Sequence, residues 1–113
     1  MKHAVHLASC VLLFGLSLSA AYGAGSVEAG KKISATCQQC HGADGNSSNA
    51  QFPRLAGQHA DYLVKALKDY KSGARKNPIM AGFAASLSKQ DRRDVAAYFA
   101  SQPNGLVTLH YRR

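Results

Sequence analysis

Apolar positions recur with a helical period in three parts of the chain, and each part predicts a helix. The clearest is 58–71, where an apolar stripe lies opposite a row of lysines and Gly73 follows as a helix stop. A last helix is predicted over 89–101, because Ser88 and Asp91 have the spacing of a capping box. The residues of this helix that are expected to face inward are Val95, Ala96, Tyr98 and Phe99.

A first helix is predicted over 27–36. Ser26 is a suitable N-cap, and Glu28 lies in the first turn, where the helix dipole favours a carboxylate. Gly30 costs this helix about 1 kcal/mol relative to alanine, which the fold either tolerates or uses for another helix that crosses close by. A short helical piece is predicted over 81–86. No segment keeps a period of two long enough to predict a strand, so the fold class is predicted to be all-α.

Two stretches between these helices lack any period. Residues 42–57 are rich in turn formers, and a loop of this length in a compact domain is usually functional. We expect it to wrap around a bound group. Residues 72–80 are also predicted to be irregular, because Asn77 and Pro78 break any helix before Met80.

Residues 1–23 have the composition of a secretory signal peptide. An apolar run follows a basic start and ends in small residues, and cleavage is expected between residues 21 and 25. Cys10 precedes the apolar core, which disfavours a lipoprotein cleavage site. The folded domain is predicted over 24–105, followed by a basic tail, 106–113, whose role the sequence does not give.

The composition changes this picture in two ways. With 113 residues, 46% of them hydrophobic, the chain is long enough for one domain at most, which excludes a multidomain enzyme. Fourteen Lys and Arg against six Asp and Glu give a net charge of +8. Export and the lack of any stacking platform disfavour nucleic acid, so the charge indicates acidic protein partners. The basic residues expected near the partner surface are Lys65, Lys68, Lys71, Arg75 and Lys76, although Lys65 and Lys68 equally fit a solvated helix face.

The most specific signal is the run Cys37-Gln38-Gln39-Cys40-His41. Two cysteines three apart on a helix present both sulfurs to one side. This geometry suits a porphyrin, whose two vinyl groups can accept the thiols as thioethers while His41 ligates the iron. A thiol redox pair usually has a βαβ context, which is missing here. A structural zinc site needs four ligands, and the mature chain has no second cysteine pair.

A six-coordinate haem iron needs a second axial ligand, and Met80 is the only methionine of the predicted mature chain. The competing interpretation is that Met80 fills the core. His59 and His110 are alternative ligands, but one lies near the start of the 58–71 helix and the other in the basic tail. An open or displaceable sixth position would indicate a ligand sensor or a catalyst, and the attachment motif does not separate these functions from electron transfer.

Taken together, these motifs resemble the class I cytochromes c. The resemblance is strongest to the short bacterial periplasmic type with one haem and to single halves of its di-haem relatives, and it spans essentially the whole mature chain. The segments that carry it are 37–45, 52–58, Tyr62-Leu63, Asn77-Pro78-Ile79-Met80 and Leu87-Ser88.

The resemblance implies a small bundle of three main helices and a short helix, wrapped around one haem c. It implies thioether bonds to Cys37 and Cys40, His41 and Met80 as the iron ligands, and Pro53 as the residue whose carbonyl accepts the His41 side-chain N–H.

The resemblance also places Gly30 where the first and last helices cross, against the region of Tyr98 and Phe99. The function that it implies is a monomeric periplasmic one-electron carrier between redox proteins, which is not an enzyme and has no stable membrane insertion after signal cleavage. The alternatives are a haem-based ligand sensor or catalyst, and a haem subunit of a larger oxidoreductase complex that docks through 106–113.

Overall fold

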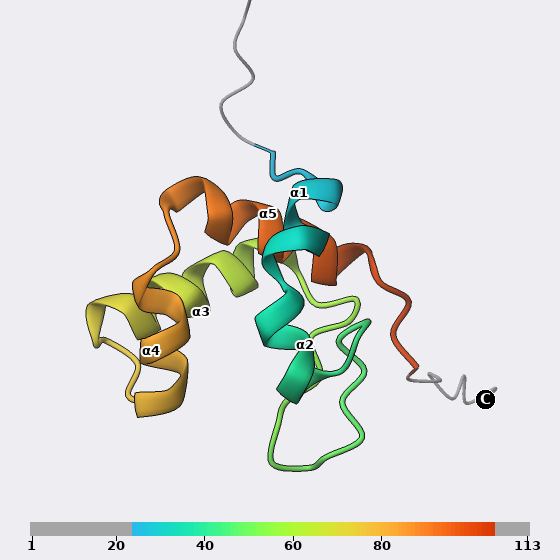
Figure 1. The fold of residues 1–113 in the computed structure, drawn as a ribbon, viewed down its shortest axis with the longest axis horizontal. Coiled ribbons are helices and arrows are strands. Elements are labelled where there is room, and N and C mark those ends of the chain that lie inside the picture. The colour runs from blue at the N-terminus through green and yellow to red at the C-terminus, as the bar shows by residue number, and fades with distance from the viewer. Residues whose placement is uncertain (1–23, 106–113) are drawn as a thin grey trace, which may run out of the picture.

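The computed structural model describes residues 24–105, which form five helices and no strand, so the all-α prediction is confirmed (Figure 1). The predicted signal peptide, 1–23, and the tail, 106–113, lie outside the described residues. The helices are α1 Val27–Ile33, α2 Ala35–His41, α3 Ala60–Ser72, α4 Pro78–Ala85 and α5 Lys89–Ser101.

The single helix predicted over 27–36 is two helices that meet at Ser34. This serine is fully buried and serves as the C-cap of α1 and the N-cap of α2. Its hydroxyl donates to the Lys31 carbonyl at 3.0 Å and accepts from the Gln38 side-chain amide at 3.0 Å. The break turns α2 away from α1 (Figure 1), and α2 continues to His41, so the whole Cys-x-x-Cys-His motif is helical.

The crossing of α1 and α5 at Gly30 is confirmed. A Cβ atom added to Gly30 would lie 1.9 Å from the Asp94 carbonyl oxygen and 2.9 Å from the Tyr98 Cβ. Glycine is therefore required for the close approach of the two backbones. The buried apolar cluster beneath this crossing consists of Leu63, Val95, Ala96, Tyr98 and Phe99.

The chain that enters α1 is also fixed on α5. The backbone N–H of Ser26 donates to the Asp94 carboxylate at 2.7 Å. A Cβ atom on Gly25 would lie 2.0 Å from the Arg93 carbonyl oxygen. Gly25 is thus packed against α5, and Ser26 is bonded to it.

The predicted glycine stop of α3 and the predicted start of α5 are confirmed, whereas α3 begins at Ala60 and not at residue 58. The Ser88 hydroxyl accepts from the Asp91 N–H at 3.1 Å, and the Asp91 carboxylate accepts from the Ser88 N–H at 2.8 Å, which completes the capping box of α5. At the end of α3, Gly73 adopts a left-handed φ of 79°, which suits a glycine C-cap.

The expectation that residues 72–80 are irregular is wrong for their last part. The helix α4 starts at Pro78, so Met80 lies in its first turn and not on a loop. Proline is well tolerated at the first helical position, where its missing N–H has no partner to lose. The Asn77 side chain caps the new helix by accepting from the Met80 N–H at 3.0 Å.

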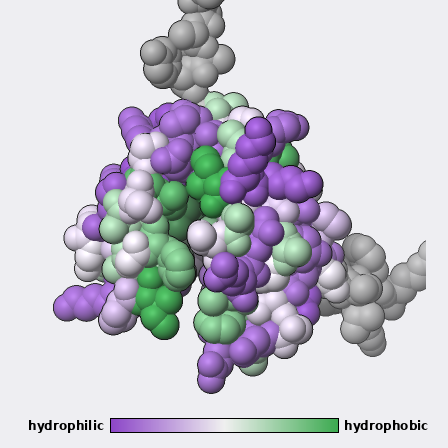
Figure 2. Space-filling model, in the orientation of Figure 1, coloured by the Kyte–Doolittle hydropathy of each residue, from purple (hydrophilic) through white to green (hydrophobic). Residues whose placement is uncertain are grey.

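The long loop 42–59 is tied to the helices around it. The Tyr98 hydroxyl on α5 donates to the Ala43 carbonyl at 2.8 Å, and the Asn46 side-chain amide donates to the Pro103 carbonyl at 2.9 Å. The loop and α2 form one side of the molecule, and α3 and α4 form the other. Figure 2 shows apolar residues gathered along a hollow between these two sides.

Candidate cofactor site

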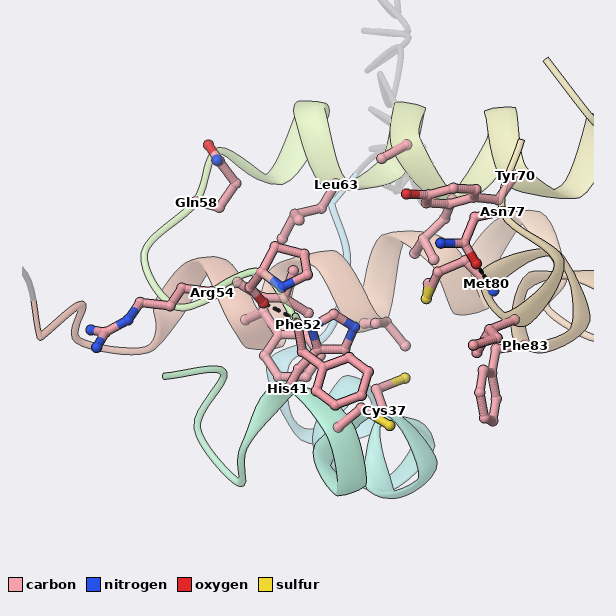
Figure 3. Close-up of a pocket in the computed structure, with 18 of the residues that line it drawn as sticks. Cys37, His41, Phe52, Arg54, Gln58, Leu63, Tyr70, Asn77, Met80 and Phe83 are labelled. Atoms are coloured by element: carbon pink, nitrogen blue, oxygen red, sulfur yellow. Dashed lines mark hydrogen bonds between the residues drawn. The ribbon is translucent and has the colours of Figure 1, made fainter. Parts of the chain in front are cut away.

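A cavity of about 390 Å³ opens between α2 with its following loop and the α3–α4 side (Figure 3). Its size lies within the range of small-molecule and cofactor pockets. Most of its lining residues are apolar or aromatic, among them Leu63, Leu67, Tyr70, Ile79, Phe83 and Val95. These walls suit a large apolar group that is held at a few polar points.

The two cysteines of the motif lie on one wall of this cavity. Cys37 and Cys40 are half-buried free thiols at positions i and i+3 of α2, so both sulfurs lie on one side of the helix. Burial raises the pKa of the Cys37 thiol, and the neighbouring Cys40 adds to the shift. A thiol redox site needs the opposite shift, since its nucleophile is the thiolate. The shift at Cys37 therefore does not favour thiol redox chemistry.

The imidazole of His41 is buried at the end of α2 and is held on two sides. Its Nδ1 lies 2.8 Å from the carbonyl oxygen of Pro53. Because a carbonyl oxygen can only accept, Nδ1 carries the proton and Nε2 keeps its lone pair. The Phe52 ring packs edge-on against the imidazole, with ring centroids 6.3 Å apart and planes at 65°. Figure 3 shows the second ring nitrogen facing the cavity.

Met80 enters the cavity from the opposite side. Its half-buried side chain comes from the first turn of α4, and its sulfur faces the imidazole of His41 across the cavity (Figure 3). All five residues predicted for the site therefore line one cavity: Cys37, Cys40, His41, Pro53 and Met80. Two thiols on one wall, with a nitrogen and a soft sulfur on two sides, fit a covalently attached haem.

The rival ligand His59 lies elsewhere. It is exposed at the N-cap of α3 and does not line the cavity, while His110 lies outside the described residues. Within residues 24–105, no three His, Cys, Asp or Glu side chains are grouped so that they could hold a metal ion. This part of the chain therefore gives no support to the structural zinc interpretation.

Arg75 and Asn77 are among the polar residues that line the cavity. Sequence reasoning placed Arg75 in the basic cluster near the partner surface and gave Asn77 no role at the site. The Arg75 guanidinium donates to the Tyr62 hydroxyl at 3.2 Å and lies 4.8 Å from the centre of the Tyr70 ring. The bond that the guanidinium donates to the Tyr62 hydroxyl raises the pKa of Arg75. Only the positive charge of Arg75 could be inferred from the sequence, because its contacts depend on how the chain folds back after Gly73. For Asn77 a signal was present, since Asn-Pro fits an N-cap followed by a first helical residue.

The basic cluster expected near the partner surface is partly engaged in local contacts. Lys65 pairs with Asp69, four residues along α3, and Lys71 donates to the Leu87 carbonyl at 2.7 Å. Lys68 and Lys76 are exposed. Of the five residues, Arg75 alone lines the cavity.

Among the helices of residues 24–105, none combines the length and the apolar character that crossing a bilayer requires.

The chain is similar to known proteins along most of its length. The family model of cytochrome c matches residues 27–103. Cytochrome c4 of Pseudomonas aeruginosa is 49% identical over 96 residues, which cover 85% of this chain and 47% of that protein. Cytochrome c-554(548) of Halomonas halodenitrificans is 42% identical over 82 residues, which cover 70% of this chain and 99% of that protein.

The structural comparison finds the same kind of protein, a cytochrome c4, as the sequence comparison. The crystal structure of reduced recombinant cytochrome c4 from Pseudomonas stutzeri superposes with a TM-score of 0.70 and 46% identity, and the match covers 74% of this chain and 48% of that one. The chain thus spans slightly less than half the length of these cytochrome c4 relatives, 47% and 48%.

Proposed function

This chain belongs to the cytochrome c family, and we propose that it carries single electrons between redox proteins by means of one covalently bound haem c. Membership of the family implies attachment through two cysteines, and Cys37 and Cys40 have the required spacing. The observation that carries the proposal is that both thiols, the His41 imidazole and the Met80 thioether line one apolar cavity.

When bound, the haem supplies an iron that changes between the ferric and ferrous states, one electron at a time. We assign His41 as the ligand on one face, through Nε2, because its Nδ1 is engaged with the Pro53 carbonyl. Met80 is assigned to the other face. If His41 and Met80 both hold the iron, no position on it would be vacant for a substrate, and the chain would act as an electron-transfer protein and not as an enzyme or a ligand sensor.

The residues around the iron influence its reduction potential in opposite directions. The apolar walls favour the ferrous form, because the ferric centre brings one more positive charge into a medium of low dielectric constant. The soft sulfur of Met80 acts in the same direction. The Pro53 carbonyl opposes both, since accepting the Nδ1–H of His41 raises the basicity of the imidazole and so stabilises ferric iron.

We further propose that the mature protein works as a monomer in the bacterial periplasm, without stable membrane insertion. The composition of 1–23 supports export. The relative that is matched over 99% of its own length supports a self-standing unit of about this size. Its partners are proposed to be redox proteins with acidic docking surfaces, because the exposed Lys68 and Lys76 and the net charge of +7 that remains without Lys2 would speed encounter with them.

Replacing Met80 by alanine in the purified holoprotein tests the axial assignment. We expect the reduced native protein to refuse carbon monoxide at neutral pH, and the M80A protein to bind it and to have a lower reduction potential. H59A is the matched control, since His59 lies outside the cavity, and it should behave like the native protein. An unchanged spectrum and potential in M80A would refute the assignment. Ready carbon monoxide binding by the native protein would instead support the ligand-sensor or catalyst interpretation.

A further inference from the structure

The residue that begins α4 also borders the cavity. Asn77 has an extended backbone, with φ −159° and ψ 112°, and its side-chain oxygen accepts from the backbone N–H of Met80 at 3.0 Å. Pro78 follows as the first helical residue, which places Met80 at the third. The one side-chain bond that caps α4 is therefore made to the residue whose thioether faces His41. Figure 3 shows Asn77 beside Met80 at the α3–α4 end of the cavity.

We propose that Asn77 is the positioning residue for Met80: by capping α4 on the Met80 amide, it holds the first turn of the helix so that the sulfur stays in place as an iron ligand. This inference rests on the proposed function, in which Met80 ligates the iron. It assigns Asn77 a role that neither the attachment motif nor the axial ligands provide.

The first turn of α4 contains no fully buried residue, so its cap is an important restraint on it. The helix has eight residues, and Ala84 near its end is the one that is buried. Ile79 is 63% exposed. A helix this short is marginal without packing or capping. Without the cap, the first turn would fray and carry Met80 away from the cavity.

The connection before α4 is restrained near its start by contacts of Arg75 with α3 and at its end by Asn77. Residues 73–77 are all exposed, and the Cβ direction of Gly73 has no atom within 4 Å. The backbone N–H of Arg75 donates to the Asp69 carbonyl at 3.0 Å, which fixes the start of this connection to α3. The end of the connection is fixed by Asn77. Met80 is three residues away from Asn77, so motion at the cap reaches the thioether directly.

The test is competition by imidazole for the Met80 position in the ferric holoprotein, followed by absorption and paired with the reduction potential. N77A should tighten apparent imidazole binding about fivefold, within the roughly two- to thirtyfold range that follows from losing a helix N-cap, and should lower the potential. N77S retains a capping oxygen and should return both values to those of the native protein. If N77A yields no holoprotein, N77G replaces it, since glycine is tolerated better at an N-cap, with a smaller change in the same direction.

The matched control is S88A, which removes the N-cap of α5 but lies outside the cavity. It should leave imidazole binding unchanged. Equal tightening in S88A and N77A would mean that the effect is one of overall stability, and would overturn the proposal. If N77A leaves imidazole binding unchanged while M80A tightens it strongly, the role of Asn77 is overturned and the proposed function is left intact. No change in M80A itself would overturn the ligation by Met80 and this inference with it.

Discussion

The carbonyl oxygen of Pro53 lies 2.8 Å from Nδ1 of His41, and this bond links the long loop to the end of α2 across twelve positions of the sequence. It fixes the tautomer of the imidazole and the direction of its free nitrogen. The loop is thereby part of the support of the site and does more than cover it.

Loosening this bond should raise the reduction potential. Pro53→Ala keeps the carbonyl but frees the backbone, so the imidazole donates less strongly and stabilises ferric iron less. A hydrogen bond of about 0.5–1.5 kcal/mol corresponds to a rise of about 20–60 mV for one electron. Protein-film voltammetry measures the change, and Pro103→Ala, outside the cavity, is the control. A potential that falls, or that shifts equally in both variants, contradicts the role given to the Pro53 carbonyl.

Two glycines should respond to alanine in opposite ways. Gly30→Ala places a methyl group against the backbone of Asp94 and should destabilise the holoprotein by about 1–3 kcal/mol. Gly82→Ala, in α4, meets nothing within 4 Å and should stabilise it by about 0.5–1 kcal/mol through helix propensity. Urea unfolding of both variants gives the two free energies. Stabilisation by both substitutions would show that α1 and α5 separate easily.

The capping box of α5 predicts a pH dependence. The backbone N–H and the hydroxyl of Ser88 hold the pKa of Asp91 below its usual value. A lowered pKa means that the ionised carboxylate contributes stability above the ordinary Asp pKa, about 3.9, and that this contribution disappears as the pH falls through the lowered value.

Asp91→Asn should therefore be less stable than the native protein at pH 7, by about 0.3–1 kcal/mol for this exposed helix-terminal charge. The two proteins should converge in acid. Urea unfolding of the two holoproteins at pH values from 7 down to 3 tests this expectation. A difference that stays constant over the whole range would mean that the charge of Asp91 plays no part.

Arg75 should couple energetically to Tyr62. The guanidinium both donates to the hydroxyl and lies over the Tyr70 ring, but it is exposed, so we expect a coupling of about 0.5–1 kcal/mol. A double-mutant cycle of R75A and Y62F in urea unfolding measures it. Arg75→Lys should not restore the coupling fully, because an ammonium lacks the planar fork of the guanidinium. Strict additivity of the two substitutions would exclude the contact in solution.

Much of this site could be predicted because its signals are local. The Cys-x-x-Cys-His run fixes which side of one helix carries the sulfurs, and the Ser88–Asp91 spacing fixes where α5 starts. The role of Gly30 could be predicted from the general rule that a glycine within a helix allows another helix to cross close by. Each prediction rested on a few neighbouring residues and a general geometric rule.

The features that were missed depend on tertiary structure or on choosing between two rules. The break at Ser34 forms because its buried hydroxyl bonds to Lys31 and Gln38, and burial cannot be inferred from the serine alone. The Asn-Pro pair before Met80 can mark either the end of one element or the start of another. We predicted that it ends an element, but in the structure it starts a helix.

The attachment of Gly25 and Ser26 to α5 bears on how export and folding are ordered in time. A signal peptidase binds an extended stretch of chain, so a cut after Gly25 would have to precede the docking of α1 on α5. A cut after Gly25 would also turn the backbone N–H of Ser26, whose nitrogen lies 2.7 Å from the Asp94 carboxylate, into a charged amine. Removal of the leader would then create an ion pair that the precursor lacks.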